Sequence, residues 1–246
     1  MHPIDIVIAA LMMCGAILYT SVGHAGSSIY IAIMSLFGVP GPIIKPTALS
    51  LNIFVSSYTS WRFGRNKLID VKLLLPLMAA GIPMAFLGGR LQLPAETFKL
   101  LLGLLLIVSG LQFAFRPQTS ESRELARPPL LVALATGGAI GFVSGLSGTG
   151  GGIFLSPIML IFGWTAVRMA SGTASVFILA NSTSGLLGNV SSIASLPPQL
   201  PLYMAAVLIG AVIGTRLGIR SFSIRGVKRA VGLVLIIAGL KLVLQL

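Results

Sequence analysis

The stretch GLSGTGGGIFLSP, residues 145–157, decides how this chain folds. It places five glycines, two serines and a threonine within otherwise apolar sequence. Glycine-rich backbone holds a helix poorly, and at bilayer depth non-helical backbone persists only where it is packed in protein or lines a polar cavity. We therefore expect a break between two helices here, with a polar ligand bound at the break.

The composition assigns the chain to a membrane. Of its 246 residues, 55% are hydrophobic and 9% charged, with a mean hydropathy of +0.99, whereas about 25% of residues are charged in soluble domains. Apolar runs near the ~20 residues that a spanning helix needs recur along the whole length. These features predict an all-α polytopic membrane protein, with the lipid bilayer as its surroundings and no sizeable soluble domain.

The charged and metal-binding residues exclude several classes of protein. The net charge of +12 comes from Lys and Arg in short clusters between apolar segments, which is typical of topology signals. No nucleic-acid partner is expected. The single cysteine, Cys14, excludes a disulfide framework or a cysteine metal cluster and is predicted to be a small buried apolar residue. We predict no cofactor and no metal. The sequence lacks the G-x-x-x-x-G-K string that binds ATP phosphates, so we do not expect transport powered by ATP hydrolysis.

Ten helical segments are predicted, and a polar break separates the first five from the last five. The break, RPQTSESRELARPP at residues 116–129, is predicted to be a cytoplasmic linker between a first transmembrane repeat, 1–115, and a second, 130–246. The predicted segments are Ile4–Val22, Ser28–Phe37, Pro46–Trp61, Val71–Arg90, Thr97–Phe115, Leu130–Leu146, Ile153–Phe162, Val167–Val190, Leu200–Ile219 and Val227–Leu244.

The two halves resemble each other in sequence. GAILYTS from Gly15 resembles GAIGFVS from Gly138, and KLLLGLLLIVSGL from Lys99 resembles KRAVGLVLIIAGL from Lys228. Further matches follow in the same order, which indicates an internal duplication.

The basic residues indicate that the two repeats are inverted. The loop Arg62–Lys72 holds four basic residues and its repeat partner, Ser191–Gln199, holds none, so equivalent loops are expected on opposite sides of the membrane. Placing the basic loops in the cytoplasm puts thirteen of the seventeen Lys and Arg residues inside and both termini outside. Each repeat is then a broken or re-entrant helical hairpin followed by three transmembrane helices, because the second hairpin arms are shorter than the ~20 residues needed to cross.

The tips of the two hairpins are predicted to form a site for a small anion. Free N–H groups and the positive dipole end of a helix that follows glycine favour anions, and inverted symmetry brings both tips to the midplane. His24 is also a candidate carrier of a coupling proton. The helices after the hairpins add uncharged polar groups, although such groups also serve as contacts between helices. The predicted substrate-binding residues are His24, Gly26, Ser27, Ser28, Thr47, Asn52, Gly148, Thr149, Gly150, Gly151, Gly152, Thr173 and Asn181.

Two stretches of the second half resemble the sequences of a known family. GFVSGLSGTGGGIFLSPIML, residues 141–160, and RMASGTAS, residues 168–175, resemble the TauE/SafE family of membrane permeases. The first half departs from the pattern, since SVGHAGSSIY at residues 21–30 replaces the usual glycine cluster. The resemblance implies secondary transport of small sulfur-containing anions, such as sulfite or organosulfonates, across the bacterial inner membrane.

The sequence is also compatible with two alternative functions. One is a transporter or channel for another small anion at the same site. The other is an intramembrane serine protease, because GLSG at residues 145–148 matches the G-x-S-G string of rhomboids. A serine nucleophile needs a histidine base within hydrogen-bond reach, and no histidine follows Ser147. We therefore predict no catalytic residues and no enzyme activity.

Overall fold

The computed structural model describes residues 3–21, 23–115, 125–219 and 225–244, and all regular structure in these ranges is helical. The predicted linker, 116–129, thus lies outside the described residues except for 125–129. The helices are α1 (Pro3–Thr20), α2 (Ser27–Leu36), α3 (Gly41–Arg65), α4 (Val71–Arg90), α5 (Ala95–Phe115), α6 (Leu130–Ser147), α7 (Gly152–Ile161), α8 (Val167–Gly188), the 3₁₀ helix η1 (Val190–Ser195), α9 (Leu200–Ile219) and α10 (Arg225–Leu244).

The helix lengths confirm the prediction of a polytopic membrane protein. Within the described residues, α1, α4, α5, α6 and α9 are long and apolar enough to cross a bilayer. The helices α3 and α8 have 25 and 22 residues but carry more polar side chains. The apolar helices α2 and α7 have only 10 residues each, or about 15 Å at 1.5 Å per residue, half of the ~30 Å hydrocarbon core.

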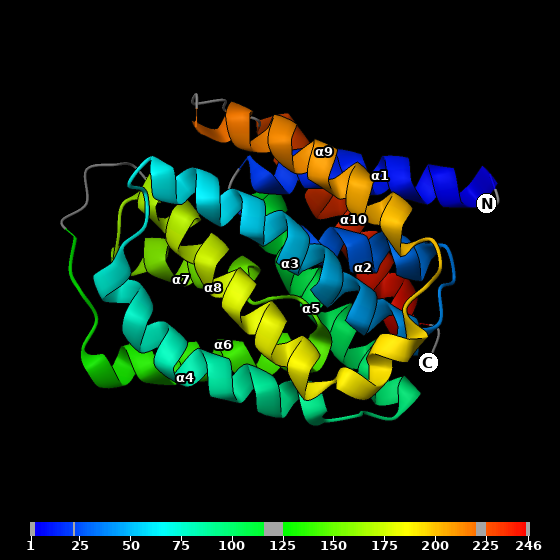
Figure 1. Cartoon of the computed structure of the whole chain (residues 1–246), viewed down its shortest axis with the longest axis horizontal. Coiled ribbons are helices and arrows are strands. Elements are labelled where there is room, and N and C mark those ends of the chain that lie inside the picture. The colour runs from blue at the N-terminus through cyan, green and yellow to red at the C-terminus, as the bar shows by residue number, and fades with distance from the viewer. Residues whose placement is uncertain (1–2, 22, 116–124, 220–224, 245–246) are drawn as a thin grey trace.

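The bundle is built from helix pairs that join the two halves of the chain. Figure 1 shows α1 beside α9 on one face, α4 beside α6 on the other, and α3 with α8 between them, and the helix contacts agree with this view. The helices α5 and α10 form a further pair. Each half therefore buries its helices against the other half.

Each hairpin has both of its ends at one end of the bundle. Ala126 N–H, just before α6, donates to Gly163 O just after α7 over 3.0 Å. Arg127 is 3.9 Å from the Asp70 carboxylate, so the α3–α4 loop lies at this end as well. Figure 1 shows both termini toward the opposite end, where Lys241 Nζ in α10 donates to Leu36 O at the end of α2 over 2.9 Å.

The same backbone conformation recurs in both hairpins. Each hairpin has three matching glycines with positive φ: one at the start of the tip, one just before the short helix and one just after the short helix. In the first half they are Gly23, Gly26 and Gly38, and in the second, at the same offset along the chain, Gly148, Gly151 and Gly163. Both hairpins therefore turn at matching glycine positions, because this conformation is costly for residues with a Cβ.

Close contact between α4 and α6 depends on small residues. A Cβ atom added to any of three glycines spaced four apart on α6 would overlap a backbone carbonyl of α4. These glycines are Gly137, Gly141 and Gly145, and they face Leu77, Gly81 and Ala85. Small residues at this spacing let helix backbones approach within a membrane, where lipid provides no hydrophobic drive for association.

Two expectations from the sequence are wrong. Cys14 is exposed on α1, because it lies on the outer face of a helix that packs its other face on α9. The third helix starts at Gly41, not at Pro46, since Pro42 occupies the first turn, where proline is tolerated, and the helix continues through Pro46.

Candidate functional site

The tips of the two hairpins are in contact inside the bundle. Every residue from Gly23 to Ser35 and from Ser147 to Ile153 is buried. His24 Nε2 lies 3.0 Å from Gly152 O, and because a carbonyl only accepts, this nitrogen carries the hydrogen. The Ser27 hydroxyl donates to Thr149 O. The first residues of α2 and α7 are thus joined to the opposite tip.

Both short helices begin with backbone donors that no side chain caps. The residue before α2 is Gly26, at φ 101°, and the residue before α7 is Gly151, at φ 81°. Among the described residues, the N–H groups of Ser27 and Ser28 have no hydrogen-bond acceptor, nor do those of Gly152 and Ile153. Such groups, together with two positive dipole ends, favour an anionic ligand.

Gly150 lies where α3 and α8 meet the second tip. Asn52 Nδ2 of α3 donates to Ser182 Oγ of α8 over 3.3 Å. A Cβ atom at Gly150 would lie 2.5 Å from Asn52 Nδ2 and 2.9 Å from Ser182 Oγ. The Asn52 Oδ1 atom is buried and has no hydrogen-bond partner in the described part of the chain. We call Gly150, Asn52, Ser182, His24 and Gly152 the tip cluster.

The remaining residues predicted from the sequence surround this cluster at different distances. Ser28 Oγ donates to the Tyr19 hydroxyl over 3.0 Å, and Thr149 Oγ1 lies 2.9 Å from Ser147 Oγ. Gly148 packs against the backbone of Lys45 in α3. These residues support the tips.

Three predicted residues make no hydrogen bond to the tips within the part of the chain that the structure describes. Thr173 Oγ1 accepts a hydrogen bond from the Asp70 N–H over 3.0 Å, so it holds the α3–α4 loop. Asn181 faces α4 beside Gly81, with both amide atoms buried and unpartnered among the described residues. Thr47 is also fully buried, with no described partner for its hydroxyl. Contact of these residues with a substrate stays a prediction.

The structure adds residues that the prediction omitted. Ser182 bonds to Asn52, and its place in the polar run Asn181–Thr183 was the only sequence signal for it. The Tyr19 ring meets the His24 ring edge-on, at 83° with centroids 6.3 Å apart. A tyrosine in an apolar run gives no sequence sign of this contact.

The site does not have the geometry of a serine hydrolase or of a metal centre. Ser147 Oγ donates to Val143 O over 2.7 Å and contacts Thr149, and the hydrogen bond found for His24 reaches Gly152. The described residues contain no group of three or more His, Cys, Asp or Glu side chains that could hold a metal ion.

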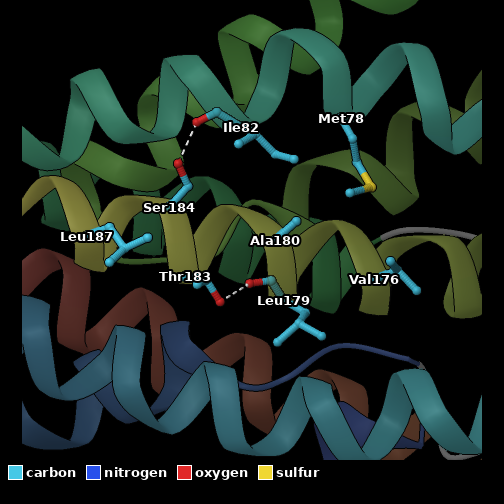
Figure 2. A pocket seen from close by; sticks show the side chains of 8 residues that line it. All are labelled: Met78, Ile82, Val176, Leu179, Ala180, Thr183, Ser184 and Leu187. Atoms are coloured by element: carbon cyan, nitrogen blue, oxygen red, sulfur yellow. Dashed lines mark hydrogen bonds between the residues drawn. The ribbon is translucent and has the colours of Figure 1, made fainter.

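A groove of about 400 Å³ runs between α4 and α8, and no residue of the tip cluster lines it (Figure 2). Its two hydroxyls bond to backbone carbonyls: Ser184 donates to Ile82 O over 2.6 Å and Thr183 to Leu179 O over 2.8 Å. The other lining residues are apolar: Met78, Ile82, Val176, Leu179, Ala180 and Leu187. With its hydroxyl hydrogens already donated, this groove is poorly suited to an anion.

Comparisons with known proteins agree with a transport function. The family model described as "Sulfite exporter TauE/SafE" matches residues 7–242. A "probable membrane transporter protein" of Sinorhizobium fredii is 38% identical over 230 residues, covering 92% of this chain and 93% of that protein. Another, from a Sinorhizobium species, is 24% identical over 231 residues, covering 92% and 86% respectively. No solved structure gives a significant match.

The helical fold and these relatives define the chain as a polytopic membrane transporter. Since the family model matches almost the whole length, the chain belongs to the TauE/SafE family.

Proposed function

We propose that this protein is a secondary transporter of small sulfur-containing anions, such as sulfite or organosulfonates, across the bacterial inner membrane. The observation that carries the proposal is the buried contact between two half-helix starts, both without a capping side chain. Discontinuous helices whose N-termini meet at the midplane are a common way for secondary transporters to hold an anion. The name of the family supports sulfite as the first substrate to test.

The proposed mechanism is alternating access around the tip cluster. The matching glycines of the two hairpins and the equivalent pairs α4–α6 and α9–α1 support an inverted repeat. We place the α3–α4 loop in the cytoplasm and both termini outside, in accordance with the basic residues. The buried tips correspond to a closed arrangement, from which each side opens in turn.

Ligand-induced stabilisation tests the substrate class. The purified protein in detergent is heated with sulfite, thiosulfate, sulfate, taurine, sulfoacetate or chloride at matched ionic strength. A ligand at 100 times its Kd stabilises the folded state by about 2.7 kcal/mol, so a sulfur anion should raise the Tm more than chloride does. Equal shifts for all anions would contradict a preference for sulfur compounds.

Transport in proteoliposomes separates a carrier from a channel. A carrier should show uptake of labelled sulfite that saturates with concentration and exchanges with sulfite inside the vesicle. Flux that stays linear in concentration would favour an anion channel, and saturable uptake of a different oxyanion would favour another substrate.

His24 is the proposed carrier of the coupling proton. A His24→Gln variant keeps a donor for Gly152 O but does not titrate near neutral pH. We expect this variant to retain sulfite exchange and to lose the acceleration of net uptake by an inward proton gradient. Gradient-driven uptake equal to that of the wild type would exclude His24 from this role.

A further inference from the structure

A buried lysine, Lys45, lies beside the second tip. Lys45 is 7% exposed, and its Nζ donates to Gly89 O over 3.0 Å and Leu91 O over 3.3 Å. Among the residues that the structure describes, no carboxylate lies within ion-pair distance of it. Its charge is therefore balanced by carbonyl dipoles at the C-terminal end of α4, a weaker counterpart than an anion.

The position of Lys45 relates it to the tip. Its backbone packs against Gly148, the left-handed glycine that ends α6 and begins the second tip: a Cβ there would lie 3.2 Å from Lys45 O and 3.4 Å from its Cγ. Leu91, one of its two acceptors, follows the last residue of α4. The helix α3 begins at the end of the bundle at which the termini lie (Figure 1), and Lys45, its fifth residue, contacts the tip from there.

The equivalent position in the other half carries no charge. Gly23, the matching glycine of the first tip, packs against Ser171. Lys45 is the fifth residue of α3 and Ser171 the fifth of α8, so the two positions correspond. A cation therefore lies beside the second tip and a hydroxyl beside the first.

We propose that Lys45 is the docking residue for the substrate anion on the side of the termini. In the closed arrangement its ammonium is held by the carbonyls of Gly89 and Leu91. When the second tip opens toward that side, the anion replaces these carbonyls on Nζ before it passes to the helix starts. This inference rests on the proposed function. It adds a binding residue for the substrate and predicts that the two sides of the membrane bind the anion differently.

The test compares two lysines that cap helix ends. Lys241 Nζ donates to Leu36 O at the end of α2 over 2.9 Å, and it provides the matched control. The wild type and the variants Lys45→Gln, Lys45→Arg and Lys241→Gln are reconstituted, and initial rates of labelled sulfite uptake are measured against concentration at two ionic strengths. Glutamine keeps a donor for Gly89 O and removes the charge. Lys45→Met serves as a second neutral variant if Lys45→Gln fails to fold.

We expect the neutral variant of Lys45 to raise the KM for sulfite on the order of tenfold, because a charge-assisted hydrogen bond to the anion is lost. The increase should shrink at high ionic strength. Lys45→Arg should keep the KM within about threefold of the wild type, and Lys241→Gln should leave it unchanged. If Lys45 only caps the end of α4, Lys45→Gln and Lys241→Gln should both lower the Tm, and neither should change the KM for sulfite. That result would overturn the inference. A wild type that transports no sulfur anion would overturn the proposed function and the inference with it.

Discussion

Gly150 is constrained in two ways within the tip cluster. It combines a φ of 74° with contacts to Asn52, Ser182 and Ile178 that leave no space for a Cβ. We expect Gly150→Ala to reduce sulfite uptake at least tenfold, as the added methyl group separates α3 and α8 from the tip. Uptake by reconstituted protein measures this.

Gly38 provides the control for this substitution. Its φ is 75°, but a Cβ there would meet nothing within 4 Å. Gly38→Ala therefore has the same backbone strain, about 1–2 kcal/mol, without the clash, and its uptake should stay near that of the wild type. Equal loss in both variants would show that backbone strain, and not the site, explains the effect.

Asn52 contributes to the same cluster through its amide. Its Nδ2 bonds to Ser182, while its buried Oδ1 has no described partner. We expect Asn52→Ala to raise the KM for sulfite about three- to tenfold, since one hydrogen bond in a buried site contributes roughly 0.5–1.5 kcal/mol. Ser57→Ala is the control on the same helix, because that hydroxyl is exposed and donates to Ile53 O within its own helix. Matching kinetics in the two variants would remove Asn52 from the site.

At the scale of elements, the α4–α6 pair depends on the absence of side chains. A Cβ at Gly141 would overlap Gly81 of α4, whereas a Cβ at Gly138 would lie 3.5 Å from Ala80 Cβ, an ordinary contact. We expect Gly141→Ala to lower the free energy of unfolding by about 1–3 kcal/mol, the usual cost of overpacking. Gly138→Ala should be nearly neutral or stabilising. Thermal unfolding in detergent compares the two, and similar Tm values would contradict this account of the interface.

The sequence predicts elements better than it predicts their contacts. The glycine-rich tip and the short apolar segments are local signals, and α2 and α7 lie within a residue of their predicted limits at each end. The partners of Thr173 and Ser182 are not local: the first bonds to Asp70 and the second to Asn52, each more than 100 residues away. Polar residues at helical spacing show which side chains are available for contacts, but the crossing of α3 and α8 decides which ones meet at the tip.

At the scale of the whole molecule, the arrangement in the membrane is open to a direct test. Lys67, in the α3–α4 loop, and Ser195, at the end of η1, are both exposed. In a Cys14→Ser background we expect Ser195→Cys to react with a membrane-impermeant thiol reagent in intact cells. Lys67→Cys should react only after the cells are opened, because its loop is predicted to be cytoplasmic. Labelling of both sites from outside would contradict the inverted topology.

The close pairing of helices from different halves also determines when the protein finishes its assembly. The helix α4 enters the membrane before its partner α6 has been synthesised, and α1 enters first although α9 completes its packing. Until then, the face of α4 that carries Gly81 and Gly88, and the face of α1 that α9 covers, lack their protein partners. The first half therefore remains unfinished while the ribosome makes the second, and the buried junction of the tips forms only after the start of α7 has been made.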